Sequence, residues 1–297
     1  MILKGQNFRI FNGTTCFGMA TNCTVTLTNN VESATTKDVV GLADMPVMTS
    51  QSWQVQVGTL LMSDVGALLT SMKNIVQFDL MWDETSTTDN YTALGEQYGR
   101  HGKAYLTDFT ATFDDRTNSL KNLTFTGTGK LSKFDSTVQT GGPVDQVYTK
   151  GQFVRLFLSS DNTTAPSKVI AAARQLSLHV SMSVENSTTK DTEDNWQVQE
   201  PTALNYDIST SALVRGGDTI TSAVTAQDLA SIEDIYEAGT PVKWQIANVS
   251  GANQRTKGSV IVSGSCLIQT LTINAENRAA ATYQANMVGY GDYTVGS

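Results

Sequence analysis

The clearest pattern in this chain is a strict alternation of apolar and polar residues, and it occurs twice. Every second residue from Leu176 to Val184 is apolar, with Ser or His between. The same register returns from Cys23 to Val31, where only Asn29 interrupts the apolar set. A period of two is typical of a β-strand with one buried face and one solvated face. We therefore predict equivalent strands in the two halves of the chain.

Each of these strands runs into a nearly identical segment. Val31–Asp38 and Val184–Asp191 share six of eight residues without a gap, and Lys4–Phe11 and Lys150–Phe157 share five of eight. The copies are 146 residues apart at the earlier segment and 153 apart at the later one. This difference predicts an insertion in the polar loop around 159–162 of the second copy. The pattern indicates an internal duplication.

The duplication predicts two domains. We place the first at residues 1–138, a turn-rich linker at 139–149 and the second at 150–297. Each half also contains one amphipathic helix signal, which begins near Ser63 in the first copy and ends at Gly239 in the second. The predicted fold class is therefore mainly β, with two tandem domains of the β-sandwich or barrel-forming type and one flanking α-helix each.

Local signals give finer expectations. Pro46 and Pro201 lie in polar stretches that we predict to be long loops or loose hairpins, because proline is rare in central strands. Each half ends in a Gly-x-Gly, at 127–129 and at 289–291, which predicts a turn that ends a strand. Thr225 has capping-box spacing to the acidic residue three positions later and is the predicted start of the second helix.

Composition narrows the class of protein. Only 16% of the residues are charged, so the polar surface must consist mainly of Thr, Ser, Asn and Gln. Such a surface favours self-association, although a Thr-rich monomer is equally compatible with it. The net charge of −8 and the absence of a Lys/Arg stripe argue against a nucleic-acid-binding protein. We also expect no signal peptide and no membrane span, because no apolar run approaches about 18 residues.

A search for catalytic chemistry finds no complete set of residues. His101 lies in a predicted turn, and His179 lies on the polar face of its strand, where the first copy has Thr26. The sequence shows no phosphate loop, dinucleotide fingerprint, nucleophile elbow or zinc ligand set. We therefore expect no enzyme activity, no cofactor and no metal. Three scattered cysteines are interpreted as reduced residues of a protein made in a cytoplasm: Cys16, Cys23 and Cys266.

The order of these elements resembles the major tail tube protein of long-tailed bacteriophages. Both halves have an opening Lys-Gly-x-x-x-Arg strand, an alternating strand that ends in Thr-Thr-Lys-Asp, a long loop, an aromatic-bearing strand and one capped helix. A Val-x-Phe/Trp strand and a strand that ends in Gly-x-Gly follow. The resemblance implies a ring of six tube domains whose sheets join into a β-barrel lumen, and rings that stack into a tube through which the genome leaves. It also implies that the loops beginning at Lys37-Asp38 and Lys190-Asp191 contact the adjacent ring.

This chain departs from that family in carrying two tube domains. We predict a trimer whose six domains form a pseudo-hexamer; a hexamer with the second copy outside is the alternative. A weakly acidic, Ser/Thr-lined bore would let viral DNA slide through without specific binding. The polar faces of the two alternating strands are the candidate lumen lining: Thr24, Thr26, Thr28, Ser177, His179 and Ser181.

The resemblance also implies a setting. It places the protein in the virion tail, made in the host bacterial cytoplasm, with a tape measure protein and tail terminator or initiator proteins as partners. The tube of a contractile tail, of an injection-system particle or of a secretion system shares the domain, and it is an alternative that the sequence does not exclude. A carbohydrate-binding or adhesive tandem β-sandwich is the alternative from a different class. A hydrolase on a β scaffold has the least support.

Overall fold

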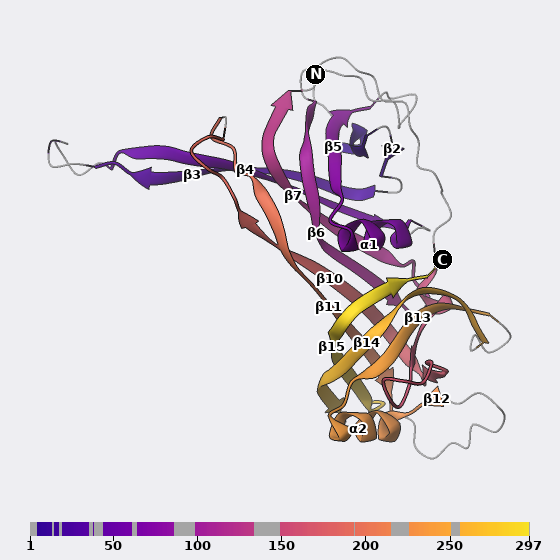
Figure 1. Ribbon diagram of the computed structural model, residues 1–297. Coiled ribbons are helices and arrows are strands. Elements are labelled where there is room, and N and C mark those ends of the chain that lie inside the picture. The colour runs from indigo at the N-terminus through magenta and orange to yellow at the C-terminus, as the bar shows by residue number, and fades with distance from the viewer. Residues whose placement is uncertain are drawn as a thin grey trace.

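The computed structural model describes residues 5–13, 15–17, 20–35, 38, 44–60, 64–85, 99–133, 149–192, 194–214, 226–250 and 256–296. Within these residues the chain is mainly β, as predicted, with fifteen strands joined in one sheet and two α-helices. Figure 1 shows two β-rich bodies, one from each half of the chain, and a long hairpin of β3 and β4 that projects away from them.

The described part of the first copy contains these elements: η1 (Gly5–Asn7, a 3-10 helix), β1 (Phe8–Asn12), β2 (Thr15–Cys16), β3 (Ala20–Ser33), β4 (Pro46–Leu60), α1 (Val65–Lys73), β5 (Gln77–Glu84), β6 (Arg100–Asp114) and β7 (Leu120–Lys133). The described part of the second copy contains these: η2 (Gly151–Phe153, a 3-10 helix), β8 (Val154–Leu158), β9 (Lys168–Ile170), β10 (Ala173–Asn186), β11 (Gln199–Leu213), β12 (Ala226–Gln227), α2 (Leu229–Ala238), β13 (Val242–Ser250), β14 (Thr256–Asn274) and β15 (Thr282–Val295).

The two copies have the same strand order. Hydrogen-bonded neighbours run β2-β1-β5-β6-β7-β4-β3 in the first copy and β9-β8-β13-β14-β15-β11-β10 in the second. We call two residues equivalent when they occupy the same position in these registers. In the first copy, Gln54 lies between Thr26 and Thr126 on the two neighbouring strands. In the second copy, Asp207 lies between His179 and Val288 in the same way. Thr26 is therefore equivalent to His179, Gln54 to Asp207, and Thr126 to Val288.

The irregularities of the two copies coincide as well. The pairing of β6 with β7 shifts register at two places, and the pairing of β14 with β15 shifts at the equivalent places. Gly129 and Gly291, which lie in β7 and β15, both have φ of 73°. These coincidences make Asp108 equivalent to Thr270, and Lys130 equivalent to Asp292. The predicted insertion is also confirmed, since residues 159–167 separate β8 from β9, whereas β1 ends at Asn12 and β2 begins at Thr15.

Of the two alternatives for the prolines, the structure shows hairpins and not long loops, since Pro46 lies in the β3–β4 hairpin and Pro201 in the β10–β11 hairpin. Pro46 is the first residue of β4, and Pro201 lies within β11 opposite Val184, at a shift in register. The early part of β11 has no partner on its other edge among the described residues, because β15 pairs with it only from Asp207 onward. Strand starts, bulges and edges are the positions where a strand tolerates the missing N–H of proline.

The Gly-x-Gly motifs do not end their strands either. Gly127 and Gly289 lie inside β7 and β15, beneath the rings of Trp53 and Tyr206. A β-carbon at Gly127 would lie 2.1 Å from the indole of Trp53, so glycine leaves room for an aromatic ring flat against the strand. The motif therefore serves packing within each copy.

Three further expectations concern single residues. The N-cap of α2 is Asp228, whose carboxylate accepts a hydrogen bond from the Ser231 N–H, while Thr225 lies outside the described residues. Gly239 ends the helix in the left-handed conformation, as predicted. His101 lies in β6 and not in a turn.

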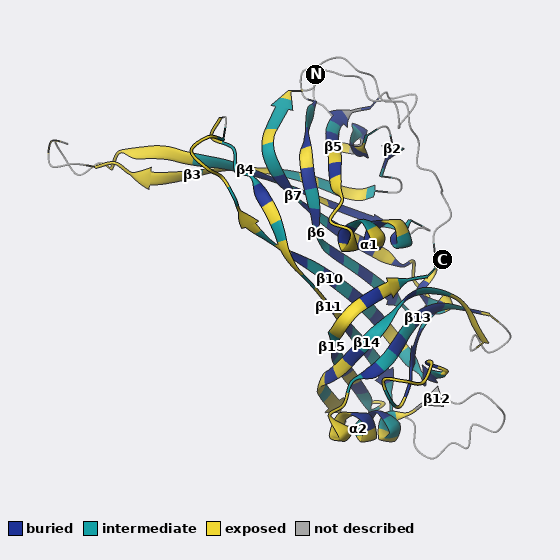
Figure 2. Ribbon diagram, viewed as in Figure 1, coloured by how far each residue is buried: buried dark blue, intermediate teal, exposed yellow. Residues whose placement is uncertain are grey.

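Both helices cover the same side of the sheet, where they join one main apolar core. Leu68 and Leu69 of α1 and Ile232 of α2 are fully or almost fully buried in it. The other side of the sheet is polar, and the outer part of the β3–β4 hairpin is exposed on both sides (Figure 2). The helices therefore cover the apolar face of the sheet and leave its polar face uncovered.

Candidate assembly interface

The two copies are joined by a strand pairing that we call the inner junction. β10 of the second copy pairs antiparallel with β6 of the first at seven positions, from Gln175 opposite Asp114 to Ser181 opposite Asp108. The first part of β6 pairs with β5 along the same edge as far as Tyr105. β10 therefore takes the stretch of edge that β5 leaves free, and the sheet is continuous across both copies.

Apolar residues fill the buried side of the inner junction. Val180 lies opposite Phe109 and Leu178 lies opposite Ala111, and all four are at most 2% exposed. Burial of one large apolar side chain contributes roughly 1.5–3 kcal/mol, and a favourable cross-strand pair adds about 0.2–1 kcal/mol. The inner junction is thus part of the hydrophobic core.

A charged cluster occupies the solvated side of the inner junction. His179 of β10 lies between Asp108 of β6 and Asp207 of β11, with Nε2 2.7 Å from Asp108 Oδ2 and Nδ1 2.7 Å from Asp207 Oδ1. Each ring nitrogen lies within hydrogen-bond distance of a carboxylate oxygen, so the protonated imidazole can donate to both carboxylates. Burial alone would lower the pKa of His179, but the hydrogen bonds and charges of the two carboxylates outweigh it and raise this pKa.

Both ring nitrogens of His179 are engaged by carboxylates of the chain itself. While the ring is protonated, it has no lone pair available for a proton or a metal ion. In the described ranges, no three His, Cys, Asp or Glu side chains are grouped so that they could hold a metal. The cluster instead connects the two copies electrostatically. The equivalent positions of the other copy hold three neutral residues: Thr26, Thr270 and Gln54.

The start of the second copy packs against the end of β6. The Gly151 N–H donates to the Thr117 carbonyl at 3.1 Å, and Asn118 and Lys150 form an isolated antiparallel bridge. A β-carbon at Gly151 would lie 2.1 Å from the Asp114 carbonyl oxygen, so this approach requires glycine. Gly5, the equivalent residue of the shared Lys-Gly-Gln motif, would have nothing within 4 Å of its β-carbon.

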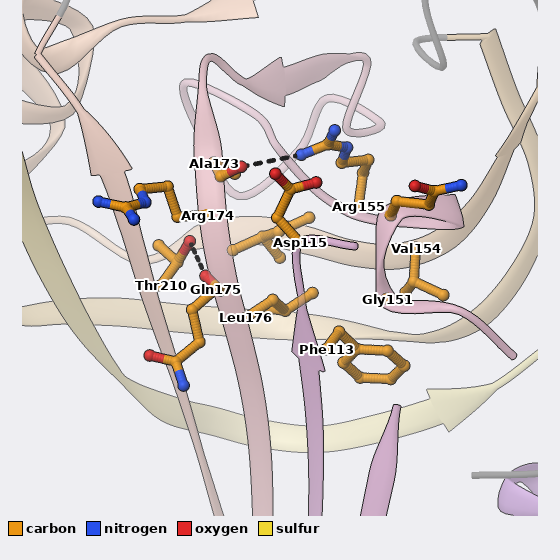
Figure 3. Close-up of a pocket in the computed structure, with 12 residues that line it drawn as sticks. Phe113, Asp115, Gly151, Val154, Arg155, Ala173, Arg174, Gln175, Leu176 and Thr210 are labelled. Carbon is orange, nitrogen blue, oxygen red and sulfur yellow. Dashed lines mark hydrogen bonds between the residues drawn. The ribbon is translucent and has the colours of Figure 1, made fainter. Parts of the chain in front are cut away.

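Figure 3 shows a small cavity at this end of the inner junction, lined from β6, η2, β8 and β10. Arg155 donates to the Ala173 carbonyl at 3.1 Å, and the Thr210 hydroxyl donates to the Gln175 carbonyl at 3.0 Å. The cavity of about 10 Å³ has room for about one water molecule, whereas small-molecule sites need roughly 300 Å³ or more. It is a gap in packing between the copies, too small for a substrate.

The loop 187–198 between β10 and β11 also contacts the first copy. The Gln51 N–H donates to the Asn195 carbonyl at 2.6 Å, and the Gln51 carbonyl accepts from the Gln197 N–H at 2.8 Å. Lys130 and Asp194 form an ion pair with 2.7 Å between Nζ and Oδ2. The loop therefore reaches sideways onto β4 and β7 of the neighbouring domain.

Helix α1 of the first copy rests on the last strand of the second. Lys73 Nζ donates to the Tyr293 carbonyl at 2.8 Å and lies 3.5 Å from Asp292 Oδ2. The Tyr293 hydroxyl donates to the Leu69 carbonyl at 2.7 Å, and burial raises the pKa of this tyrosine well above its ordinary value. The two copies are thus held by a strand pairing, a close backbone contact, a loop and a helix.

Both partner surfaces of the inner junction are present a second time, and there they have no partner in the described chain. β3, the equivalent of β10, pairs with β4 alone. β14, the equivalent of β6, pairs with β13 only as far as Cys266, so residues 267–274 present a free edge on that side. We call β3 and this part of β14 the open edges.

Apolar residues on the open edges face solvent. Leu27, equivalent to the buried Val180, is 59% exposed, and Ile273, equivalent to the buried Ala111, is 48% exposed. Free backbone N–H and C=O groups beside exposed aliphatic side chains are a template for pairing with another chain. Among the described residues, the open edges therefore combine unpaired backbone groups with exposed aliphatic side chains.

The candidate lumen residues lie on the polar face of the sheet, away from the helices. Those of β3 are exposed and those of β10 are half-buried: Thr24, Thr26, Thr28, Ser177, His179 and Ser181. Of the candidate stacking residues, Asp38, Lys190 and Asp191 are exposed, whereas Lys37 lies outside the described residues. Their roles in a lumen and in stacking stay predictions.

Sequence reasoning missed the residues that hold the copies together. Asp108 and Asp207, the partners of His179, were not singled out, although a histidine among the serines of a polar strand face was a usable signal. The shared Lys-Gly-Gln motif was used only to align the copies, while Gly151 shows that it marks a close contact. Neither α1 nor α2, the α-helices of the described chain, has the length and apolar character that crossing a membrane requires.

Three solved structures are similar to part of this chain. One is the tail of an empty gene transfer agent (GTA) particle from helical refinement with C6 symmetry, at 15% identity and a TM-score of 0.37, covering 49% of this chain and 95% of that chain. The second is a chain of the native GTA virion, at 14% identity and a TM-score of 0.36, covering 50% of this chain and 99% of that chain. The third is the SPP1 tail tube, at 15% identity and a TM-score of 0.35, covering 50% of this chain and 78% of that chain. TM-scores this low describe a partial likeness and carry no functional assignment.

No protein-family model and no curated protein matches the sequence.

Proposed function

We propose that the chain is the structural subunit of a phage tail tube, and that three chains close into a ring of six equivalent β-domains. One observation carries the proposal: the chain makes one junction internally and leaves both halves of an equivalent junction open. A molecule with a surface at one end and its complement at the other assembles head to tail, and it closes into a ring where the rotation allows. With two domains per chain, three chains supply six domains.

We call the proposed pairing of the open edges of two chains the outer junction, and the inner junction gives its register. Equivalent residues place β3 of one chain antiparallel to the open edge of β14 in the next. The pairs on the buried side would be aliphatic, and the pairs between them would be polar: Leu27 opposite Leu271, Val25 opposite Ile273, Thr26 opposite Thr272 and Thr28 opposite Thr270.

The energetics favour a closed ring over isolated pairs. Burying the exposed half of Leu27 or Ile273 contributes roughly 1–1.5 kcal/mol each, and each new backbone hydrogen bond adds a net of about 0.5–1.5 kcal/mol. Association of two chains costs about 4–15 kcal/mol, so a single outer junction is weak. In a closed ring, each chain forms one outer junction with each of its two neighbours, so dissociation of a chain from the ring breaks two junctions.

The polar face of the sheet would line the bore of such a ring. Thr, Ser, Asn and Gln dominate this face along β3, β10, β11 and β15, and the inner junction places His179 among them beside two carboxylates. Few cations then face a phosphate backbone. DNA would pass without being held, because affinity for DNA comes mainly from Lys and Arg contacts to phosphate.

Stacking of the rings would use the loops that begin at Asp38 and Lys190. The exposed turn at Lys190 and Asp191 supports this, because the later part of the same loop already contacts the neighbouring domain. A tape measure protein inside the tube and terminator or initiator proteins at its ends complete the assembly, which lies in the virion tail after synthesis in the host bacterial cytoplasm. No membrane contact and no cofactor enter this function.

Disulfide trapping tests the outer junction directly. The full chain would carry Leu27→Cys and Leu271→Cys in a Cys23→Ser background, because directly opposed strand residues fall within the Cα separation of about 4.4–6.8 Å that a disulfide needs. Mild oxidation at high protein concentration should give a covalent ladder that stops at three chains, and negative-stain images should show rings or tubes.

The matched control pairs Leu27→Cys with Leu267→Cys on the same edge, roughly 13 Å out of register. It should give no ladder. Dispersed monomers with no cross-link in either variant would refute the ring and favour a tandem binding module. A ladder beyond three chains would keep the outer junction but refute the trimer. A surrounding sheath in images of the native particle would assign the tube to a contractile tail or injection system.

A further inference from the structure

The helix contact of the inner junction has a counterpart of reversed charge. Lys73 lies nine residues after Asp64, the N-cap of α1, and Glu237 lies nine residues after Asp228, the N-cap of α2. On the other partner, Asp292 and Lys130 each follow a glycine with φ of 73°. The pair Lys73–Asp292 of the inner junction therefore corresponds to Glu237 and Lys130, with the cation and the anion exchanged.

The helix face around Lys73 is buried, whereas the equivalent face around Glu237 is exposed. The strand residues of the inner junction and of the open edges differ in the same way. Met72 of α1, next to the Lys73 that bonds β15, is 1% exposed, whereas its equivalent Tyr236 in α2 is 46% exposed. Leu69 of α1 is fully buried, and its equivalent Glu233 is not. The face of α2 that corresponds to the β15-covered face of α1 is thus uncovered in the described chain, and its residues are amphipathic or acidic.

We propose that this face of α2 binds the Lys130 end of β7 in a second copy of the chain, with Glu237 paired to Lys130. This rests on the proposed ring and extends it with a second lateral contact, because β7 of the next chain is carried to α2 when its β3 pairs with β14. Lys130 already bonds Asp194 of its own chain, so the contact places one ammonium between two carboxylates.

The reversal of charge also selects the partner. If α1 met β7, Lys73 would face Lys130, and if α2 met β15 of another chain, Glu237 would face Asp292. Contacts between like copies are therefore like-charged, and contacts between unlike copies are complementary. Specificity of this kind comes from destabilising the wrong pair as well as stabilising the right one. It acts during assembly, when free chains first associate.

The test compares two charge reversals on the same helix in the full chain. Glu237→Lys puts two cations together at the outer junction only. Asp234→Lys makes the same change in net charge at an exposed position, whose equivalent Thr70 is exposed on α1. We expect Glu237→Lys to weaken ring formation about fivefold per contact at low salt, with the deficit shrinking as salt screens the charges, and Asp234→Lys to behave as wild type. The fraction of rings is measured by mass photometry across protein and salt concentrations.

Two readouts keep the inference separate from the ring itself. Adding Lys130→Glu to Glu237→Lys restores the opposite charges and should recover part of the lost assembly. Rings that form equally well with Glu237→Lys and Asp234→Lys at every salt concentration would overturn the helix contact and leave the ring standing. Failure of the Leu27–Leu271 cross-link in the otherwise unaltered chain would instead remove the ring and the helix contact together.

Discussion

Replacing Gly5 with alanine or valine should leave the isolated chain as stable as before and prevent its rings from closing. Nothing lies within 4 Å of a β-carbon at Gly5, so the folded chain has room for a larger side chain there. A glycine replaced at a permissive position even stabilises by about 0.4–1 kcal/mol, because the unfolded chain loses freedom. In the outer junction, however, Gly5 would occupy the position that Gly151 occupies on Asp114.

The size of the effect follows from the inner junction. A β-carbon at Gly151 would lie 2.1 Å from the Asp114 carbonyl oxygen and 2.6 Å from its nitrogen, closer than real β-carbons approach backbone atoms. The backbone would have to move apart by roughly 1 Å, and overpacking of this kind costs about 1–3 kcal/mol. For Gly151→Ala the cost falls on folding. For Gly5→Ala it falls on each of three outer junctions, about 3–9 kcal/mol per ring.

Two measurements on the same samples check this prediction. Thermal unfolding of the monomer should give an unchanged or slightly higher Tm for Gly5→Ala and Gly5→Val, and a lower Tm for Gly151→Ala. Mass photometry should show that both Gly5 variants remain monomeric at concentrations where the wild type forms rings. Normal rings from Gly5→Val would refute the equivalence of the two junctions, and a lowered monomer Tm would show that Gly5 is packed within its own chain.

Two further predictions concern the charged residues of the chain. The raised pKa of His179 means that its contribution to stability is complete below the unfolded value of about 6.5 and is lost as pH rises through the folded pKa. The free energy of unfolding of the monomer, measured by urea titration, should fall by less than about 1 kcal/mol over that range, and His179→Gln should flatten this pH dependence. Asp64 holds the buried ammonium of Lys121, whose pKa burial lowers. Asp64→Asn should therefore destabilise the monomer by about 3 kcal/mol, and a loss below about 0.5 kcal/mol would contradict this account.

Local periodicity and repetition were enough to predict the elements of the fold. The alternation around His179 and its copy around Thr26 predicted two strands in the same register, and the structure pairs them identically with β11 and β4. The change in offset between the copies located the insertion after β8, because insertions are tolerated in loops. These features depend on neighbours along the chain, which a sequence displays directly.

Features that depend on distant partners could not be read in the same way. The sequence could not decide between a loop and a hairpin at Pro201, because the tolerance of a strand for proline depends on an unpaired edge, which only the sheet order reveals. Gly127 looked like a turn because the ring of Trp53 that requires it lies 74 residues earlier. The inner junction was invisible for the same reason: β6 changes partner from β5 to β10 midway along its length, with no mark in its sequence.

The two junctions need different properties, and their residues differ accordingly. The inner junction forms within one chain, where the linker keeps its partners at an effective concentration in the millimolar range. It can therefore contain the His179 cluster, whose charges add specificity more than affinity. In the proposed ring, the outer junction would form between free chains. Its equivalents of that cluster are neutral, and its aliphatic residues Leu27 and Ile273 are larger than their respective equivalents Val180 and Ala111, so its driving force would come from apolar burial. Duplication would thus allow each of the two interfaces to be adjusted separately, which a single-domain subunit that repeats one interface six times cannot do.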